Sequence, residues 1–162
     1  MSSNLPISRR TLLAGFAASS VIMTSRASLA TETLPKMVVT KDPNCGCCTG
    51  WVKHVQAAGF NVEVLESSEV NRLKIRLGVP EALASCHTAE IGGYVIEGHV
   101  PPAAIKRLLA EKPDGKGLAV PGMPVGSPGM EVEGMEPDTY EVILFGPSGQ
   151  RTYARYTGAR EA

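Results

Sequence analysis

Apolar and polar positions along the chain predict an alternation of strands and helices from residue 36 onward. Residues 37–40 form a short apolar run, which predicts a strand, and turn-forming residues follow it. Apolar side chains then recur at helical spacing from about residue 47 to Gly59, and again from residue 67 to Gly78. Between these two helices, residues 60–64 alternate apolar and polar side chains, as a half-buried strand does. The first half of the pattern is therefore βαβα.

The next stretch predicts a β-hairpin and a third helix. Strands over residues 84–91 and 94–97 flank Gly92-Gly93, and two glycines supply the positive φ angles that a two-residue hairpin turn needs. Pro101-Pro102 suits the first turn of the following helix, because proline there loses no intrahelical hydrogen bond. The order becomes βαβαββα, which predicts an α/β core over residues 36–110.

The rest of the chain predicts a long loop and a terminal hairpin. Residues 112–138 are rich in glycine and proline and contain methionine, so we expect a long ordered or semi-ordered loop without regular elements. Residues 140–145 and 151–156 are strand-like and flank Gly146-Pro147-Ser148-Gly149, which predicts a C-terminal hairpin over residues 140–156. A single domain over residues 31–162 accounts for all of these elements.

The first 30 residues have the features of an export signal. Arg9-Arg10 precedes an uncharged, weakly apolar stretch over residues 12–23. That stretch is shorter than the roughly 20 residues that span a bilayer, which disfavours the alternative of a membrane anchor. Ser28-Leu29-Ala30 supplies the small residues of a cleavage site. We therefore predict a twin-arginine-type signal peptide over residues 1–30, a periplasmic mature chain, and no stable membrane insertion after cleavage.

The charge balance argues against nucleic acid as a partner. The whole chain carries 16 basic and 16 acidic side chains, and losing the three arginines of the predicted signal leaves 13 basic against 16 acidic. Arg72, Lys74 and Arg76 form a basic cluster, but they lie with acidic residues nearby on a predicted helix, as a solvated face does. Nucleic-acid binding needs a positive surface for the phosphates, so we expect no such partner.

Three of the four cysteines lie in one tetrapeptide, Cys45-Gly46-Cys47-Cys48, between the first predicted strand and the first predicted helix. A helix N-terminus stabilises thiolates, because its unpaired N–H groups and the helix dipole place positive potential there. The thiolate is both the nucleophilic and the metal-ligating form of cysteine. The tetrapeptide therefore predicts a soft-metal or redox site at this corner.

Four motifs together resemble a bacterial metal-binding family long described as a domain of unknown function, whose copper-resistance members are called CopG. The motifs are Cys45-Gly46-Cys47-Cys48, Ser85-Cys86-His87-Thr88, Gly98-His99-Val100-Pro101 and the glycine- and proline-rich stretch over residues 117–131. The resemblance runs from about residue 36 to residue 156. It implies a thioredoxin/glutaredoxin-like βαβαββα sheet with helices on both faces, the gathering of Cu(I) by cysteines, and a role in copper resistance. In a sheet of that kind Cys86 would face the clustered cysteines, so that four thiols converge.

Copper is the metal that this donor set favours. Soft thiolates select Cu(I), and thiolates that bridge several Cu(I) ions tolerate crowding. Zinc is less suited, because structural zinc sites use two separated Cys-x-x-Cys turns and the adjacent Cys47 and Cys48 point in divergent directions. We therefore expect Cys45, Cys47, Cys48 and Cys86 to bind Cu(I), as a small cluster if several ions are held.

A redox alternative keeps the thiols and needs no metal. In an oxidising compartment the cysteines tend to pair, and Cys45 with Cys48 is geometrically the easiest first bridge, which leaves Cys47 for Cys86. A Cys45–Cys48 dithiol at a helix N-terminus could exchange thiols with other proteins. Purely structural disulfides are a third reading. The chain is thus predicted to be a metal-binding protein, with a thiol-disulfide or copper oxidoreductase as the alternative.

Methionine and histidine side chains are possible accessory ligands. Met123 and Met130 are soft thioether donors in the loop, and packing against the sheet is an equally good explanation for them. His87 follows Cys86 in a predicted strand, so we expect it to point to the opposite face unless the strand bulges. His99 precedes the third helix and could cap it or support a ligand. Copper ions and other periplasmic copper-handling proteins are the predicted partners.

Overall fold

The computed structural model describes residues 33–162, so the predicted signal peptide over residues 1–30 lies outside the described residues. Within the described range, no helix is long and apolar enough to cross a membrane. The elements of residues 33–162 follow one another in this order: β1 (Met37–Lys41), α1 (Gly46–Ala57), β2 (Val62–Glu66), α2 (Val70–Leu77), the 3-10 helix η1 (Glu81–Leu83), β3 (His87–Ile91), β4 (Tyr94–Glu97), α3 (Pro102–Glu111), β5 (Gly117–Ala119), β6 (Thr139–Gly146), β7 (Gly149–Thr157) and β8 (Arg160–Glu161).

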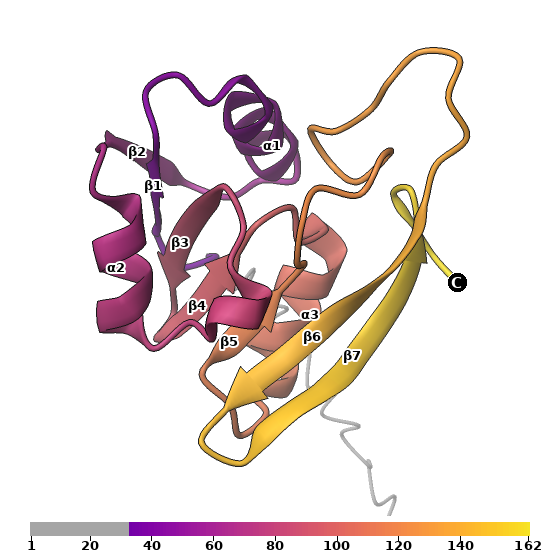
Figure 1. Cartoon of the computed structure of the whole chain (residues 1–162). Helices are drawn as coiled ribbons and strands as arrows, with labels where there is room; N and C mark the ends of the chain where they lie inside the picture. The colour runs from indigo at the N-terminus through magenta and orange to yellow at the C-terminus, as the bar shows by residue number, and fades with distance from the viewer. Residues whose placement is uncertain (1–32) are drawn as a thin grey trace, which may run out of the picture. The chain divides into compact units, whose positions relative to one another are not determined.

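The strands form one mixed sheet in the order β2-β1-β3-β4-β5-β6-β7-β8 (Figure 1). β1 is parallel to β2 and antiparallel to β3, and β4 is parallel to β5. The other neighbouring strands are antiparallel. The predicted α/β class is confirmed, as is the terminal hairpin, which β6 and β7 form around the predicted turn.

Successive residues of the strands face two separate hydrophobic cores. Ile96 of β4 belongs to the larger core, where Trp51 of α1 and Ile105 of α3 are fully buried. Its neighbour Val95 belongs to the smaller core, together with Leu83 of η1. Because side chains alternate between the faces of a strand, α1 and α3 cover one face of the sheet, and α2 and the η1 segment cover the other, as expected of helices on both faces.

The loop predicted over residues 112–138 contains a strand, so that expectation is wrong in part. β5 lies between β4 and β6 and joins the terminal hairpin to the main sheet. Gly117 permits this pairing, because a Cβ atom there would lie 1.8 Å from the carbonyl oxygen of Val95. A strand of three residues within a glycine- and proline-rich segment is too short to give a periodic pattern.

Two further strands differ from the prediction. The strand expected over residues 84–91 begins only at His87, and residues 84–86 are irregular after the 3-10 helix Glu81–Leu83. The strand predicted to be half-buried is β2, which lies at the edge of the sheet and leaves Val64 38% and Leu65 45% exposed. The late start of β3 matters for the site, because it leaves Ser85 and Cys86 outside the strand ladder.

Candidate metal centre

Three of the four cysteines are placed by the first turn of α1. Asp42 starts the turn after β1, where its side chain accepts a hydrogen bond from the Asn44 N–H at 2.8 Å. Cys45 is the N-cap residue, with an extended backbone, and α1 begins at Gly46. Cys47 is partly exposed and Cys48 is fully buried. The loop and the helix start therefore hold three sulfur atoms in one turn.

The Cys45 and Cys48 sulfur atoms are joined in a disulfide, which leaves Cys47 and Cys86 as free thiols. Cys47 Sγ lies 3.5 Å from Cys45 Sγ and 3.9 Å from Cys86 Sγ. All four sulfur atoms lie within 4.8 Å of one another, a spacing that could hold a metal ion. The predicted convergence of Cys86 on the tetrapeptide is thus found, and we call these four residues the sulfur cluster.

His87 lies beside Cys86, although alternation predicted the opposite face for it. Its Nδ1 is 3.3 Å from Cys86 Sγ, and its ring is fully buried 4.4 Å from the Trp51 ring, measured between centroids. The expectation was wrong because Cys86 precedes the first residue of β3. Strand alternation places the His87 side chain on the α1 face, and Cys86, outside the ladder, is free to turn to the same side.

One ring nitrogen of His99 also lies close to the Cys86 thiol. Its Nε2 lies 3.1 Å from Cys86 Sγ, while its Nδ1 lies 2.8 Å from the carbonyl oxygen of Pro128. A carbonyl only accepts, so Nδ1 carries the hydrogen and Nε2 presents a lone pair to the thiol. His99 does not cap α3, whose N-cap is Pro101 and which has no side-chain cap.

Cys86, His87 and His99 form a second group that could hold a metal, and Cys86 also belongs to the sulfur cluster. Burial raises the pKa of Cys86 to about 12, and the neighbouring Cys47 adds to the rise. Burial also lowers the pKa of His87 well below its usual value, with His99 and Lys74 contributing, and it lowers the pKa of His99. Near neutral pH the free protein thus holds a protonated Cys86 and two neutral imidazoles, and neutral imidazole is the form that ligates metals. Among the described residues, the buried His87 Nε2 has no hydrogen-bond partner.

The segment over residues 121–131 lies beside α1 (Figure 1). Gly129 makes the contact with a φ of +86°, and a Cβ atom there would lie 2.4 Å from the Trp51 backbone nitrogen. Ser85 Oγ donates to the Gly122 carbonyl at 2.6 Å, at the start of the segment. At its end, His54 Nε2 lies 2.8 Å from a Glu131 carboxylate oxygen. Backbone packing and these polar contacts hold the segment beside the sulfur cluster.

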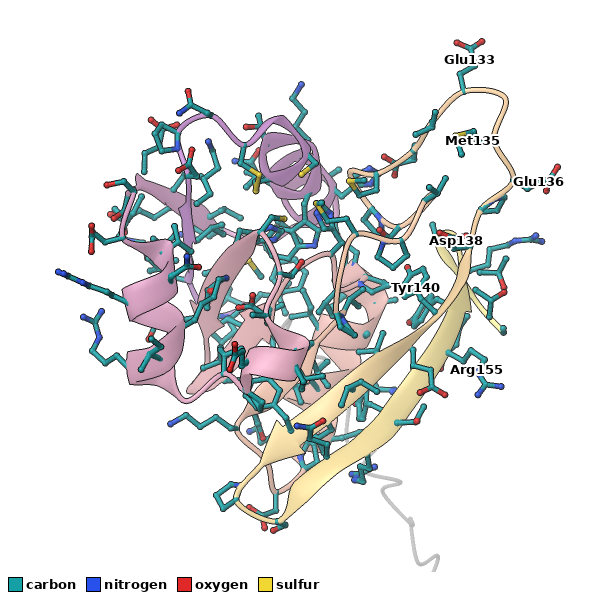
Figure 2. The ribbon with its side chains drawn as sticks, viewed as in Figure 1. Glu133, Met135, Glu136, Asp138, Tyr140 and Arg155 are labelled. Carbon is teal, nitrogen blue, oxygen red and sulfur yellow. A yellow bond between two sulfur atoms is a disulfide. The ribbon has the colours of Figure 1, made fainter. Side chains whose placement is uncertain are left out.

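Of the loop methionines, Met123 lies next to the thiols. Its Sδ is 4.0 Å from Cys47 Sγ, and its side chain is 51% exposed. Met130 instead shapes a turn with its backbone, which donates to Ser127 and accepts from Gly126. Met135 is 56% exposed and lies in the outer part of the loop, near Glu133 and Glu136 in Figure 2. Of these three methionines, Met123 is therefore the candidate for an accessory metal ligand.

Comparisons with known proteins show what this chain resembles. Residues 83–130 match a family described as "Protein of unknown function, DUF411". Two solved structures, described as "Copper resistance protein copG- Form 1" and "Form 2", are each 46% identical to this chain with a TM-score of 0.71. They cover 77% and 76% of this chain, and 99% and 98% of their own chains are covered. A search of the curated proteins found no match.

The fold and the site make this chain an α/β protein with a group of cysteines that could bind a metal. The structural relatives then define the family. This chain belongs to the CopG-like copper-resistance family.

Proposed function

We propose that this protein binds Cu(I) through the sulfur cluster and acts in copper resistance. The observation that carries the proposal is the approach of four sulfur atoms to within 4.8 Å of one another. Thiolate sulfur is the donor that Cu(I) prefers, and the Met123 thioether 4.0 Å from Cys47 adds another soft donor. The names of the two related structures support copper as the cargo.

The number of donors supports a small multinuclear cluster. Four thiols with Met123, His87 and His99 at their rim offer more ligands than one Cu(I) ion uses. Cys86 lies close both to the other cysteines and to the two histidines, which favours a Cys86 thiolate that bridges two Cu(I) ions. We therefore expect more than one Cu(I) per chain once the Cys45–Cys48 disulfide is reduced.

A copper oxidoreductase is the second candidate, and the Cys45–Cys48 disulfide favours it. The balanced step is that one dithiol reduces two Cu(II) ions to two Cu(I) ions, forming one disulfide and releasing two protons. The reverse step would consume the disulfide and release Cu(II). In this reading the Cys45–Cys48 pair is the reductant, and Cys47 and Cys86 keep the thiols that can bind the Cu(I) product.

We further propose that the sheet is thioredoxin-like and that the protein works in the periplasm. The parallel β1–β2 pair, the antiparallel β3 and β4, and a Cys-x-x-Cys at the start of α1 support the first point. The twin arginine at Arg9-Arg10 and the small residues before Thr31 support export of residues 31–162. Other periplasmic copper-handling proteins are then the partners that deliver or accept the metal.

An anaerobic titration tests the Cu(I) proposal. The fully reduced chain is mixed with Cu(I) bound to a chromophoric chelator, and we expect it to withdraw more than one equivalent. The same chain with the Cys45–Cys48 disulfide intact is the control, and it should bind fewer ions because two thiols are blocked. A reduced chain that withdraws less than one equivalent contradicts the proposal.

An activity assay tests the second candidate. The reduced protein is mixed anaerobically with Cu(II), and Cu(I) and free thiols are counted together. Two Cu(I) ions formed for each Cys45–Cys48 disulfide would support the oxidoreductase, and Cys45→Ser should abolish that stoichiometry. An insulin-reduction assay with the same variant measures thiol exchange with proteins. Turnover lost in Cys45→Ser would make exchange the primary role.

A further inference from the structure

A buried ion pair contacts the residue that precedes Cys86. Its two residues come from α2 and β4, and a residue of β3 bonds to both of them. Lys74 of α2 is 4% exposed and Glu97 of β4 is fully buried, and Lys74 Nζ lies 2.6 Å from Glu97 Oε1. Thr88 of β3 completes a triangle. It accepts a hydrogen bond from Lys74 Nζ at 2.8 Å and donates one to Glu97 Oε2 at 2.7 Å. Each partner of the pair is thus satisfied inside the protein.

Such a pair is costly to bury, because both charges lose their hydration, and well-packed apolar residues often serve stability better. A third contact indicates what this pair does. The backbone N–H of Ser85 donates to Glu97 Oε1 at 2.6 Å. Ser85 lies between η1 and β3, outside the strand ladder, so no neighbouring strand supplies that N–H with an acceptor. The residue after it is Cys86.

We propose that Glu97 is a positioning residue for Cys86: its carboxylate anchors the Ser85 backbone and thereby fixes the thiol that completes the sulfur cluster. Lys74 and Thr88 in turn hold the carboxylate. A hydrogen bond to a charged acceptor is about twice as strong as a neutral one, which suits an anchor for an irregular segment. The proposal rests on the Cu(I) function proposed above.

The chain beyond Glu97 strengthens the same anchor. Gly98 has a φ of +71°, and a Cβ atom there would lie 2.6 Å from Ser85 Cβ. Close backbone packing at Gly98 and the hydrogen bond of Ser85 Oγ to Gly122 hold this residue from two more sides. Cys86 therefore follows a residue that is fixed on three sides, and its sulfur meets Cys47 at 3.9 Å.

Two double variants separate anchoring from stability. Lys74→Met with Glu97→Gln removes both charges but keeps a side-chain oxygen that can accept the Ser85 N–H. Lys74→Met with Glu97→Met removes the same charges, fills a similar volume and offers no acceptor. Any difference between them reports on the anchor, because each lacks the ion pair.

The first readout needs no metal. Starting from protein with the Cys45–Cys48 disulfide, diamide takes up two electrons and two protons as Cys47 and Cys86 form a second disulfide, and mass spectrometry follows the loss of both thiols. We expect the Gln variant to react within about threefold of the wild type and the Met variant at least about tenfold more slowly, since misplaced groups react slowly. Equal rates for the two variants would overturn the proposal.

A second measurement uses the wild-type protein and does not depend on the variants folding. The Ser85 amide hydrogen, which lies outside the strand ladder, should exchange with solvent at least about tenfold more slowly than an exposed amide. Exchange at the exposed rate would also overturn the proposal. Both results are independent of copper. If the wild type fails to bind Cu(I), the proposed function falls, while the diamide and exchange results still decide whether Glu97 positions Cys86.

Discussion

Cys47 and Cys86 lie 3.9 Å apart, yet the segments that carry them are built in different ways. Cys47 sits on the first turn of a helix, in one tetrapeptide with Cys45 and Cys48, and it is partly exposed beside Met123. Cys86 belongs to an irregular segment between η1 and β3, and two fully buried histidines lie against its thiol.

The difference suggests that the two sides of the site have different tasks. The helix side, Cys45 to Cys48, is local and carries the Cys45–Cys48 disulfide, so it suits the arrival of copper and exchange with partners. The strand side, Cys86 with His87 and His99, is assembled from residues distant in sequence, and its two histidines are fully buried, so it suits retention. The predictions that follow test this division, from the largest expected effect to the smallest.

Removing Cys47 should have the largest effect. It is the sulfur that contacts Cys45, Cys86 and Met123, so it joins the two sides. We expect Cys47→Ser to weaken Cu(I) binding at least about a hundredfold, since a hydroxyl is a poor ligand for Cu(I). Competition with a chromophoric chelator measures this. Binding within about threefold of the wild type would show that the two sides act separately.

Raising the pH should strengthen Cu(I) binding through Cys86. Its pKa is raised to about 12, mainly by burial, so the thiol is protonated in the free protein and must release its proton to the solvent when copper binds. Protons compete with the metal, and the affinity should rise about tenfold per pH unit for this one thiol between about pH 6 and pH 9. Cys86→Ser should lower the slope of log affinity against pH by about one. An unchanged slope would place the displaced proton elsewhere.

A Cβ atom at Gly129 should push residues 121–131 away from α1 and expose the Cys86 side of the site. Gly129→Ala combines a positive φ with a Cβ atom 2.4 Å from the Trp51 backbone nitrogen. We expect a loss of more than about 1 kcal/mol in the free energy of unfolding, and faster alkylation of Cys86. Gly134→Ala is the matched control, because its φ of +77° is similarly positive and no atom lies within 4 Å of the added Cβ. If both variants lose the same free energy of unfolding and alkylate Cys86 at the same rate, backbone strain at a positive φ would explain the effect without the contact to Trp51.

The smallest effect concerns the exposed thioether. Met123→Leu keeps the size of the side chain and removes the soft donor 4.0 Å from Cys47. We expect the rate of Cu(I) uptake to fall by about twofold to fivefold with little change in stability, since the side chain is half exposed. Met135→Leu, in the outer loop, should change nothing. If both variants behave alike, Met123 has no part in copper capture.

The helix side of the site could be predicted from the sequence because its chemistry is local. A tetrapeptide with three cysteines between a strand and a helix identifies the site without further structure. The approach of Cys86 was also expected, but only through the family resemblance, since 38 residues separate it from Cys48. Spacing along the chain contains no information on such contacts.

The strand side could not be predicted in full. Whether Cys86 and His87 lie on the same side depends on where β3 begins, and just before that point the Ser85 N–H donates to a buried carboxylate. Lys74 was assigned to a solvated basic face on charge pattern alone, yet it is 4% exposed and paired with Glu97. β5 was missed because its pairing depends on Gly117 approaching the β4 backbone. In each case the deciding partner is distant in sequence.

X-ray absorption at the copper edge tests the central claim most directly. The reduced protein is loaded anaerobically with Cu(I), and the same measurement is made on Cys86→Ser. We predict a first shell dominated by sulfur with a second copper nearby. Cys86→Ser should lower the number of sulfur ligands per copper and remove the copper–copper signal, because Cys86 bridges the two sides. A shell of nitrogen or oxygen, or a sulfur shell that Cys86→Ser leaves unchanged, would contradict a copper site completed by the fourth thiol.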